Sequence, residues 1–444
     1  MSEQPPQLRA RWLLVCLCAL VALVGLGGSA WRIATEGVGV LGANNAVPWG
    51  WDIVSFVFWI GLGHAGTLIS AMLLLSRQSW RGEIARHAEL MTLCAILTAA
   101  IYPLVHVGRI WMLWLLSPLP VASGVWPNVA SPLVWDALAI GSYFVLSLMF
   151  WHIGMRGERA DVGHLRPLWG RVCMGLAVVL TVLVITVHSV VGCDFAVLFR
   201  WHAPGLPPYF VCGALLSGMA AVQLIELGIH RGAQSRCREP LARLTLVFSL
   251  LMGLFYALEL WESPGLWSGG YAFMLACNVL LPGGYWCAAA RSSRKLIAFV
   301  SVGVLLGMWW ERVHIIVCRS EWYTEASYAP SGVDVAMLCG GVGLFLALFL
   351  ALSARMPCEQ ACPAAAAALP CRYQPGRVAR AGMIAGVLGF LGWYAATQWA
   401  DTAGVVSARP LGYPFIIPPL LVCALLGAGL ALALLFYVHL RKRS

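Results

Sequence analysis

Charged residues are scarce in this sequence: Asp, Glu, Lys and Arg make up only 11% of its 444 residues. Apolar residues make up 60%, and the mean hydropathy is +0.80. This composition excludes an ordinary soluble domain and predicts a polytopic membrane protein in contact with lipid. The net charge of +10 does not indicate a nucleic-acid partner, because the basic residues lie in short loops between apolar runs.

Cysteine motifs for cofactors are also lacking. The sequence has no Cys-x-x-Cys, and therefore no Cys-x-x-Cys-His for covalent haem. Most of the fifteen cysteines occur singly in apolar runs, where cysteine behaves as a small hydrophobic residue. A loosely spaced group, Cys358, Cys362 and Cys371, leaves a metal site as a minor alternative.

Twelve apolar runs are long enough to span a bilayer, which predicts an all-α membrane protein of twelve helices. The first run, 12–30, ends in Gly-Gly-Ser-Ala, which resembles a signal-peptide cleavage site, although we expect this helix to be retained. The others cover residues 50–76, 90–116, 131–154, 171–198, 207–229, 240–262, 269–290, 295–318, 331–354, 379–400 and 416–440.

Basic residues gather on one side when these helices are threaded alternately through the membrane. The opposite side receives only Arg32, Arg200, Arg319 and Arg409. Positive loops face the cytoplasm, so both termini are predicted to be cytoplasmic.

The stretch 102–109, Tyr-Pro-Leu-Val-His-Val-Gly-Arg, puts ionisable groups inside the third run. Tyr102, His106 and Arg109 are spaced i, i+4 and i+7, which predicts one helix face. A charge near the bilayer centre costs at least about 2.5–3.5 kcal/mol, so a functional site is favoured over a structural ion pair.

Further ionisable residues fall in the outer half of the predicted helices, which favours a proton relay on that side. They are Asp136, His188, Asp194, Glu259, Glu262, Glu311, Arg312 and His314. The cytoplasmic half offers chiefly Gln223 and Glu226. We assign to the proton path His64, Glu259, Glu262, Glu311 and His314. A b-type haem held by His106 and His188 is a minor alternative.

Several motifs resemble those of the NrfD/PsrC-type quinol-interacting membrane subunits, and more narrowly the ActC-like (ActF-related) subunit of bacterial alternative complex III. They lie at residues 45–67, 103–109, 131–136, 187–196, 207–210 and 307–312, in consistent order. The resemblance covers residues 12–355. It implies a ten-helix core with a pocket for quinol or menaquinol near the outer side, and no haem or iron–sulfur cluster of its own.

The resemblance also implies site residues and partners. His106 and Asp136 match the residues expected to contact the quinol head group and are predicted to be catalytic and to approach each other. Tyr102, Arg109, His188 and Asp194 complete the predicted quinol-binding set. Implied partners are an outer-side iron–sulfur protein, multihaem cytochrome c subunits and a second NrfD-like subunit, in the bacterial cytoplasmic membrane.

The end of the sequence departs from this pattern. An Ala/Pro-rich stretch, 356–378, is predicted to be a cytoplasmic linker after the core domain, 1–355. Residues 379–444 resemble the membrane hairpin of the ActD-like subunit, with an unrelated extension as the alternative.

Two classes of function follow. The first is quinol oxidation within an alternative complex III-like assembly or, in a close variant, in the membrane anchor of a molybdopterin oxidoreductase. The second is a non-catalytic scaffold or proton-conducting subunit.

Overall fold

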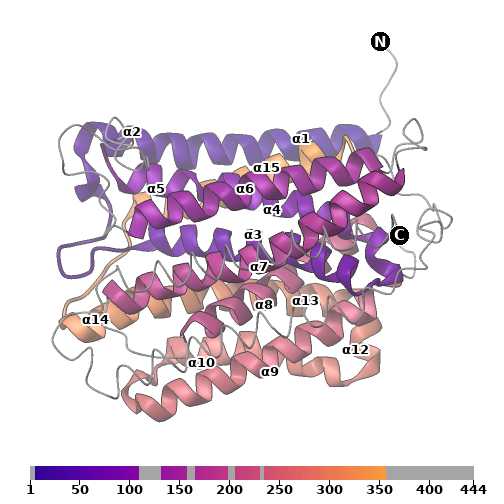
Figure 1. Cartoon of the computed structure of the whole chain (residues 1–444). Helices are drawn as coiled ribbons and strands as arrows, with labels where there is room; N and C mark the ends of the chain where they lie inside the picture. The colour runs from indigo at the N-terminus through magenta and orange to yellow at the C-terminus, as the bar shows by residue number, and fades with distance from the viewer. Residues whose placement is uncertain (1–5, 110–131, 158–165, 199–205, 231–234, 357–444) are drawn as a thin grey trace, which may run out of the picture. The chain divides into compact units, whose positions relative to one another are not determined.

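The structure, a computed structural model, describes residues 6–109, 132–157, 166–198, 206–230 and 235–356. Every regular element in these ranges is a helix, so the all-α prediction is confirmed for this part of the chain (Figure 1). The longer helices are α1 (Pro6–Ala22), α2 (Gly28–Glu36), α3 (Trp51–Leu75), α4 (Ala85–Ala99), α6 (Pro132–Gly157), α7 (Arg166–Leu198), α8 (Leu206–Ile229), α9 (Arg238–Glu262), α13 (Arg294–Val313) and α15 (Gly332–Ser353).

Short helices connect or extend these. They are the 3₁₀ turns η2 (Val38–Val40), η3 (Ser79–Glu83), η6 (Pro264–Leu266) and η8 (Gly284–Trp286), the π turns η1 (Leu23–Gly27), η7 (Ala276–Leu280) and η9 (His314–Cys318), and the α turns α5 (Ile101–His106), α10 (Gly269–Leu275), α11 (Leu281–Gly283), α12 (Ala288–Ser292) and α14 (Arg319–Thr324).

Eight helices in the described ranges are long and apolar enough to cross a membrane. They match the predicted first, second, third, fifth, sixth, seventh, ninth and tenth runs, with ends shifted by up to about six residues, except that the third helix ends at His106, before its predicted limit of residue 116. The fourth run forms α6, whose apolar part, Ala139–Met155, is shorter. The eleventh and twelfth runs lie outside the described residues, so the count of twelve and the side of the termini stay predictions.

The predicted eighth helix, 269–290, is helical without a gap from α10 through the π turn η7 and α11 to the 3₁₀ turn η8, and it is interrupted at Cys287, whose backbone is extended. Pro282 lacks an N–H and its ring clashes with the carbonyl four residues earlier, that of Asn278. That carbonyl accepts a hydrogen bond from the hydroxyl of Ser249 on α9 at 2.8 Å. The carbonyl of Asn278, in the π turn η7, is therefore satisfied by a side chain of the neighbouring helix, which sequence spacing alone does not show.

The chain divides into two compact units. Among the described helices, the first unit holds α1, α2, the first part of α3, α4, α5, most of α8, and α9 to α15. The second holds the last part of α3 together with α6 and α7, which pack along each other. The first unit ends for the first time at Gly66, in the middle of α3. It includes α4 and α5 and then resumes at Cys212 in α8.

Within the first unit, α1 and α15 run antiparallel, side by side (Figure 1). Arg11 near the start of α1 donates to the carbonyl of Leu350 and to Ser353 at the end of α15. At the other end the two backbones approach closely at Gly25, where a Cβ atom would overlap the carbonyl oxygen of Ala336. Small residues permit such approaches between membrane helices.

Replacing Gly25 by alanine is therefore expected to destabilise the protein, by about 1–3 kcal/mol for an overpacked contact. The added methyl group meets backbone, which cannot rotate away. The matched control is Gly28→Ala, three residues later, where a Cβ meets nothing within 4 Å. The check is the thermal unfolding midpoint in detergent, which should fall for Gly25→Ala alone. Equal midpoints would contradict the close approach.

Candidate functional site

The histidine at the end of α5 pairs with the aspartate at the start of α3. The Nδ1 atom of His106 lies 2.7 Å from Oδ2 of Asp52. The Asp52 side chain is 0% exposed and that of His106 is 20% exposed, so the ring is the accessible member. Oδ1 of Asp52 is buried and has no hydrogen-bond partner among the described residues. With Nδ1–H donating to the carboxylate, Nε2 is the acceptor nitrogen and can take a proton from a substrate hydroxyl.

Local backbone features place this pair. Asp52 lies in the first turn of α3, where the helix dipole favours a carboxylate. Pro103 separates α5 from α4, because it cannot donate to the carbonyl of Ala99. Gly108 follows with φ +68°, a left-handed conformation that ends helices and favours glycine. His106 is thus the last residue of α5, at the level where α3 begins.

The end of α5 corrects one prediction. Arg109 lies beyond the helix and is exposed, so it does not share a helix face with Tyr102 and His106. The reason is the turn at Gly108, which interrupts the i, i+4, i+7 spacing before its third member. Tyr102 does lie one turn before His106, but it is fully buried and its hydroxyl donates to the carbonyl of Met337 at 3.1 Å. It packs α5 against α15.

A tyrosine from the loop before α15 lies against the start of α3. The Tyr328 hydroxyl accepts the backbone N–H of Trp51 at 3.0 Å, next to Asp52. Burial raises the pKa of Tyr328, and the charges of Asp334 and Asp52 raise it further. The phenol therefore stays neutral at physiological pH. Among the groups described around Asp52, the imidazole of His106 belongs to the residue type whose ordinary pKa lies near neutral pH.

A second buried polar group surrounds Glu259 near the end of α9. Arg319 of α14 donates from Nη2 to Oε1 of Glu259 at 2.6 Å, and its side chain is only 3% exposed. Nε2 of His314 lies 3.6 Å from the same oxygen. The Tyr271 hydroxyl lies 3.3 Å from Oε2, and its ring meets the His314 ring edge to face at 5.1 Å. The π turn η9 carries His314 into this cluster, and such turns often occur at functional sites.

The ninth predicted helix supplies a further buried ion pair. Arg312 Nη1 lies 2.6 Å from Glu311 Oε2, and both side chains are almost completely buried. On the π turn η7, the Asn278 amide donates to the Tyr256 hydroxyl at 2.8 Å. The first unit therefore holds a fully buried Glu311 and a largely buried Glu259, each beside an arginine.

The other predicted site residues lie elsewhere. His64 is buried at the middle of α3, and Asp136 and His188 are buried on α6 and α7 of the second unit. The His188 ring lies 6.0 Å from that of Phe210. The side chains of Asp194 and Glu262 are outside the described residues. The approach of His106 to Asp136 concerns different units and stays a prediction, as does the haem alternative with His188.

Sequence reasoning does not single out three residues that the geometry brings forward: Asp52, Tyr271 and Arg319. A signal exists for Asp52, an isolated carboxylate at the start of an apolar run. Alternate threading predicts that Arg319 lies in an outer loop, whereas it is buried at the start of α14. Its pairing with Glu259 depends on the folding of residues sixty positions apart, which spacing does not reveal.

Comparison with known proteins matches a family profile and two relatives. The profile described as "Polysulphide reductase, NrfD" matches residues 39–321. A protein of Halobacterium salinarum, described as a putative membrane component of dimethyl sulfoxide reductase, is 24% identical over 407 residues, covering 78% of this chain and 92% of the relative. The "Hdr-like menaquinol oxidoreductase integral membrane subunit" of Archaeoglobus fulgidus is 25% identical over 248 residues, covering 54% of this chain and 58% of the relative.

Proposed function

Because this chain belongs to the polysulphide reductase NrfD family and is an integral multi-pass membrane protein, we propose that it is the quinol-binding subunit of a membrane oxidoreductase complex. The observation that carries the proposal is the pair of His106 and Asp52, a partly exposed imidazole backed by a fully buried carboxylate. The name of one relative, a menaquinol oxidoreductase subunit, supports menaquinol as the substrate class.

The chemistry follows from this geometry. Oxidising a quinol to a quinone releases two protons and two electrons. The Nε2 atom of His106 accepts one hydroxyl proton, and Asp52 holds the ring tautomer and stabilises the imidazolium that forms. Asp136 is the proposed acceptor of the second proton. The electrons pass to a cofactor of a partner subunit, an iron–sulfur protein in our proposal.

The motif resemblance supports a place in an alternative complex III-like assembly, with multihaem cytochrome c subunits and a second NrfD-like subunit. The names of the two relatives support a second candidate, the membrane anchor of a molybdopterin or Hdr-like oxidoreductase. In both candidates the quinol site is the same and only the electron acceptor differs. The proteins that co-purify with this chain distinguish the two candidates. A multihaem cytochrome is expected for the alternative complex III-like assembly, and a catalytic reductase subunit is expected for the membrane anchor.

Substituting His106 by glutamine is expected to weaken binding of a quinol analogue about fivefold, because the hydroxyl of the analogue loses the Nε2 acceptor and one neutral hydrogen bond contributes about 1 kcal/mol. The measurement is an equilibrium fluorescence titration of the purified complex. The control is His152→Gln, at an exposed histidine of α6. Unchanged affinity for His106→Gln, with both variants folded, would favour the scaffold alternative.

A further inference from the structure

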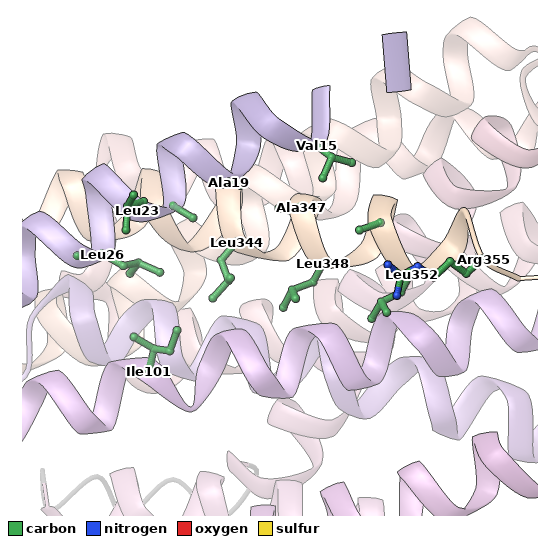
Figure 2. Close-up of a pocket in the computed structure, with 13 residues that line it drawn as sticks. Val15, Ala19, Leu23, Leu26, Ile101, Leu344, Ala347, Leu348, Leu352 and Arg355 are labelled. Carbon is green, nitrogen blue, oxygen red and sulfur yellow. The ribbon is translucent and has the colours of Figure 1, made fainter. Parts of the chain in front are cut away.

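An apolar groove of about 560 Å³ runs along the antiparallel pair of α1 and α15 (Figure 2). Its size is within the range of about 300–1,000 Å³ typical of small-molecule sites. One wall presents Val15, Ala19 and Leu23, and the other presents Leu344, Leu348 and Leu352. Each set is spaced i, i+4, i+8 and therefore forms a stripe along one helix face. The groove can accommodate a long aliphatic chain.

One end of this groove is positively charged. Arg355 lines it there, just after the last residue of α15 (Figure 2). Arg11, at the same helix end, already donates to Leu350 and Ser353. The side chain of Arg355 is exposed and makes no hydrogen bond or ion pair with any described residue. A guanidinium without a partner among the described residues, beside an aliphatic groove, is suited to an amphiphile with an anionic head.

The depth of the groove matches one leaflet of a bilayer. From Leu344 to Arg355 the helix rises about 17 Å, roughly half of the hydrocarbon core of about 30 Å. Since α15 is long enough to span that core, Arg355 falls at the membrane surface, at the level of lipid phosphates. Basic pockets between membrane helices bind anionic lipid head groups in this way.

We propose that the groove is a site for one anionic phospholipid, with an acyl chain between α1 and α15 and its phosphate on Arg355. The bound lipid fills the space between the two helices on one leaflet and so fastens α1 to the rest of the first unit. A quinol has a neutral head and therefore lacks the charge–charge attraction to Arg355 that a phosphate has. The site is independent of the pair of His106 and Asp52, so either proposal can fail without the other.

Native mass spectrometry of the full-length protein tests the proposal by comparing retained phosphatidylglycerol with retained phosphatidylcholine. Arg355→Gln should weaken phosphatidylglycerol binding about fivefold, the usual contribution of one basic residue near an anionic lipid surface, and should leave phosphatidylcholine unchanged. Lys295→Gln, at an exposed lysine of α13, is the charge control. Ala19→Phe should block the groove and abolish retention of the lipid, whereas Leu13→Phe on the outward face of α1 should not.

A photoreactive residue at position 19 identifies the occupant directly. We expect its crosslink to phosphatidylglycerol in the full-length protein. A crosslink to quinone or to residues 357–444 would overturn the proposal, and so would equal retention of the two lipids or retention that survives Ala19→Phe.

Discussion

Replacing Asp52 by asparagine is expected to lower quinol turnover by about a hundredfold or more, within the range of about 10²–10⁴ for loss of general acid–base catalysis. Asparagine keeps the shape of the side chain but carries no charge to stabilise a protonated His106. It can also present its amide N–H₂ to Nδ1, which would favour the tautomer with the proton on Nε2. The ring nitrogen that should accept the quinol proton would then already hold one.

The double variant decides whether the two residues act as one unit. Because His106 and Asp52 meet at 2.7 Å, Asp52→Asn combined with His106→Gln should be no slower than the slower single variant. The measurement is steady-state oxidation of a soluble quinol by the purified complex. Glu36→Gln, at an exposed carboxylate of α2, is the control. If the losses in turnover of the two single variants multiplied in the double variant, the two residues would not act in one step.

The helices are predictable because their signal is local. A run of about twenty apolar residues spans a bilayer whatever surrounds it, and α3, α8 and α15 begin and end within about two residues of the predicted limits. The errors occur where a single residue interrupts the run. The predicted eighth helix is interrupted at Cys287, and Gly108 removes Arg109 from the face of Tyr102 and His106.

The site is predictable only in part, because partners are set by tertiary packing. The sequence indicates His106 and Glu259, since ionisable residues in apolar helices are costly unless they are used. It cannot show that His106 meets Asp52, fifty-four positions earlier, or that Glu259 meets Arg319. Each pairing joins helices that are far apart in the chain. Helical periodicity does not indicate which of these helices pack against each other.

The pairing of Glu259 with Arg319 leads to the second large expected effect. The sequence assigns Glu259 and Glu262 to the predicted proton path and indicates no counter-charge for Glu259. The structure places Arg319 at 2.6 Å from Glu259, in a nearly fully buried position. Glu259→Gln therefore leaves a buried guanidinium without its counter-charge, and the expected loss of stability is about 3–5 kcal/mol.

Thermal unfolding in detergent measures this effect, with a control on the same helix. Glu239 and Arg243 of α9 also meet at 2.6 Å, but their side chains are 57% and 65% exposed. Glu239→Gln should leave the unfolding midpoint unchanged, since water screens an exposed pair. If Glu259→Gln and Glu239→Gln shifted the midpoint equally, the buried ion pair would be contradicted.

A double variant then separates the stability of this cluster from its predicted role as a proton path. In Glu259→Gln combined with Arg319→Gln no buried charge of the pair remains unmatched, so the midpoint should return toward that of the unsubstituted protein. Turnover per folded molecule should stay low, because His314 would still lie in the cluster but the carboxylate 3.6 Å from its Nε2 would be gone. Protons leaving the quinol site through this cluster would then lack the acceptor beside His314. Recovery of turnover together with stability would instead show that Glu259 and Arg319 only hold α9 to α14.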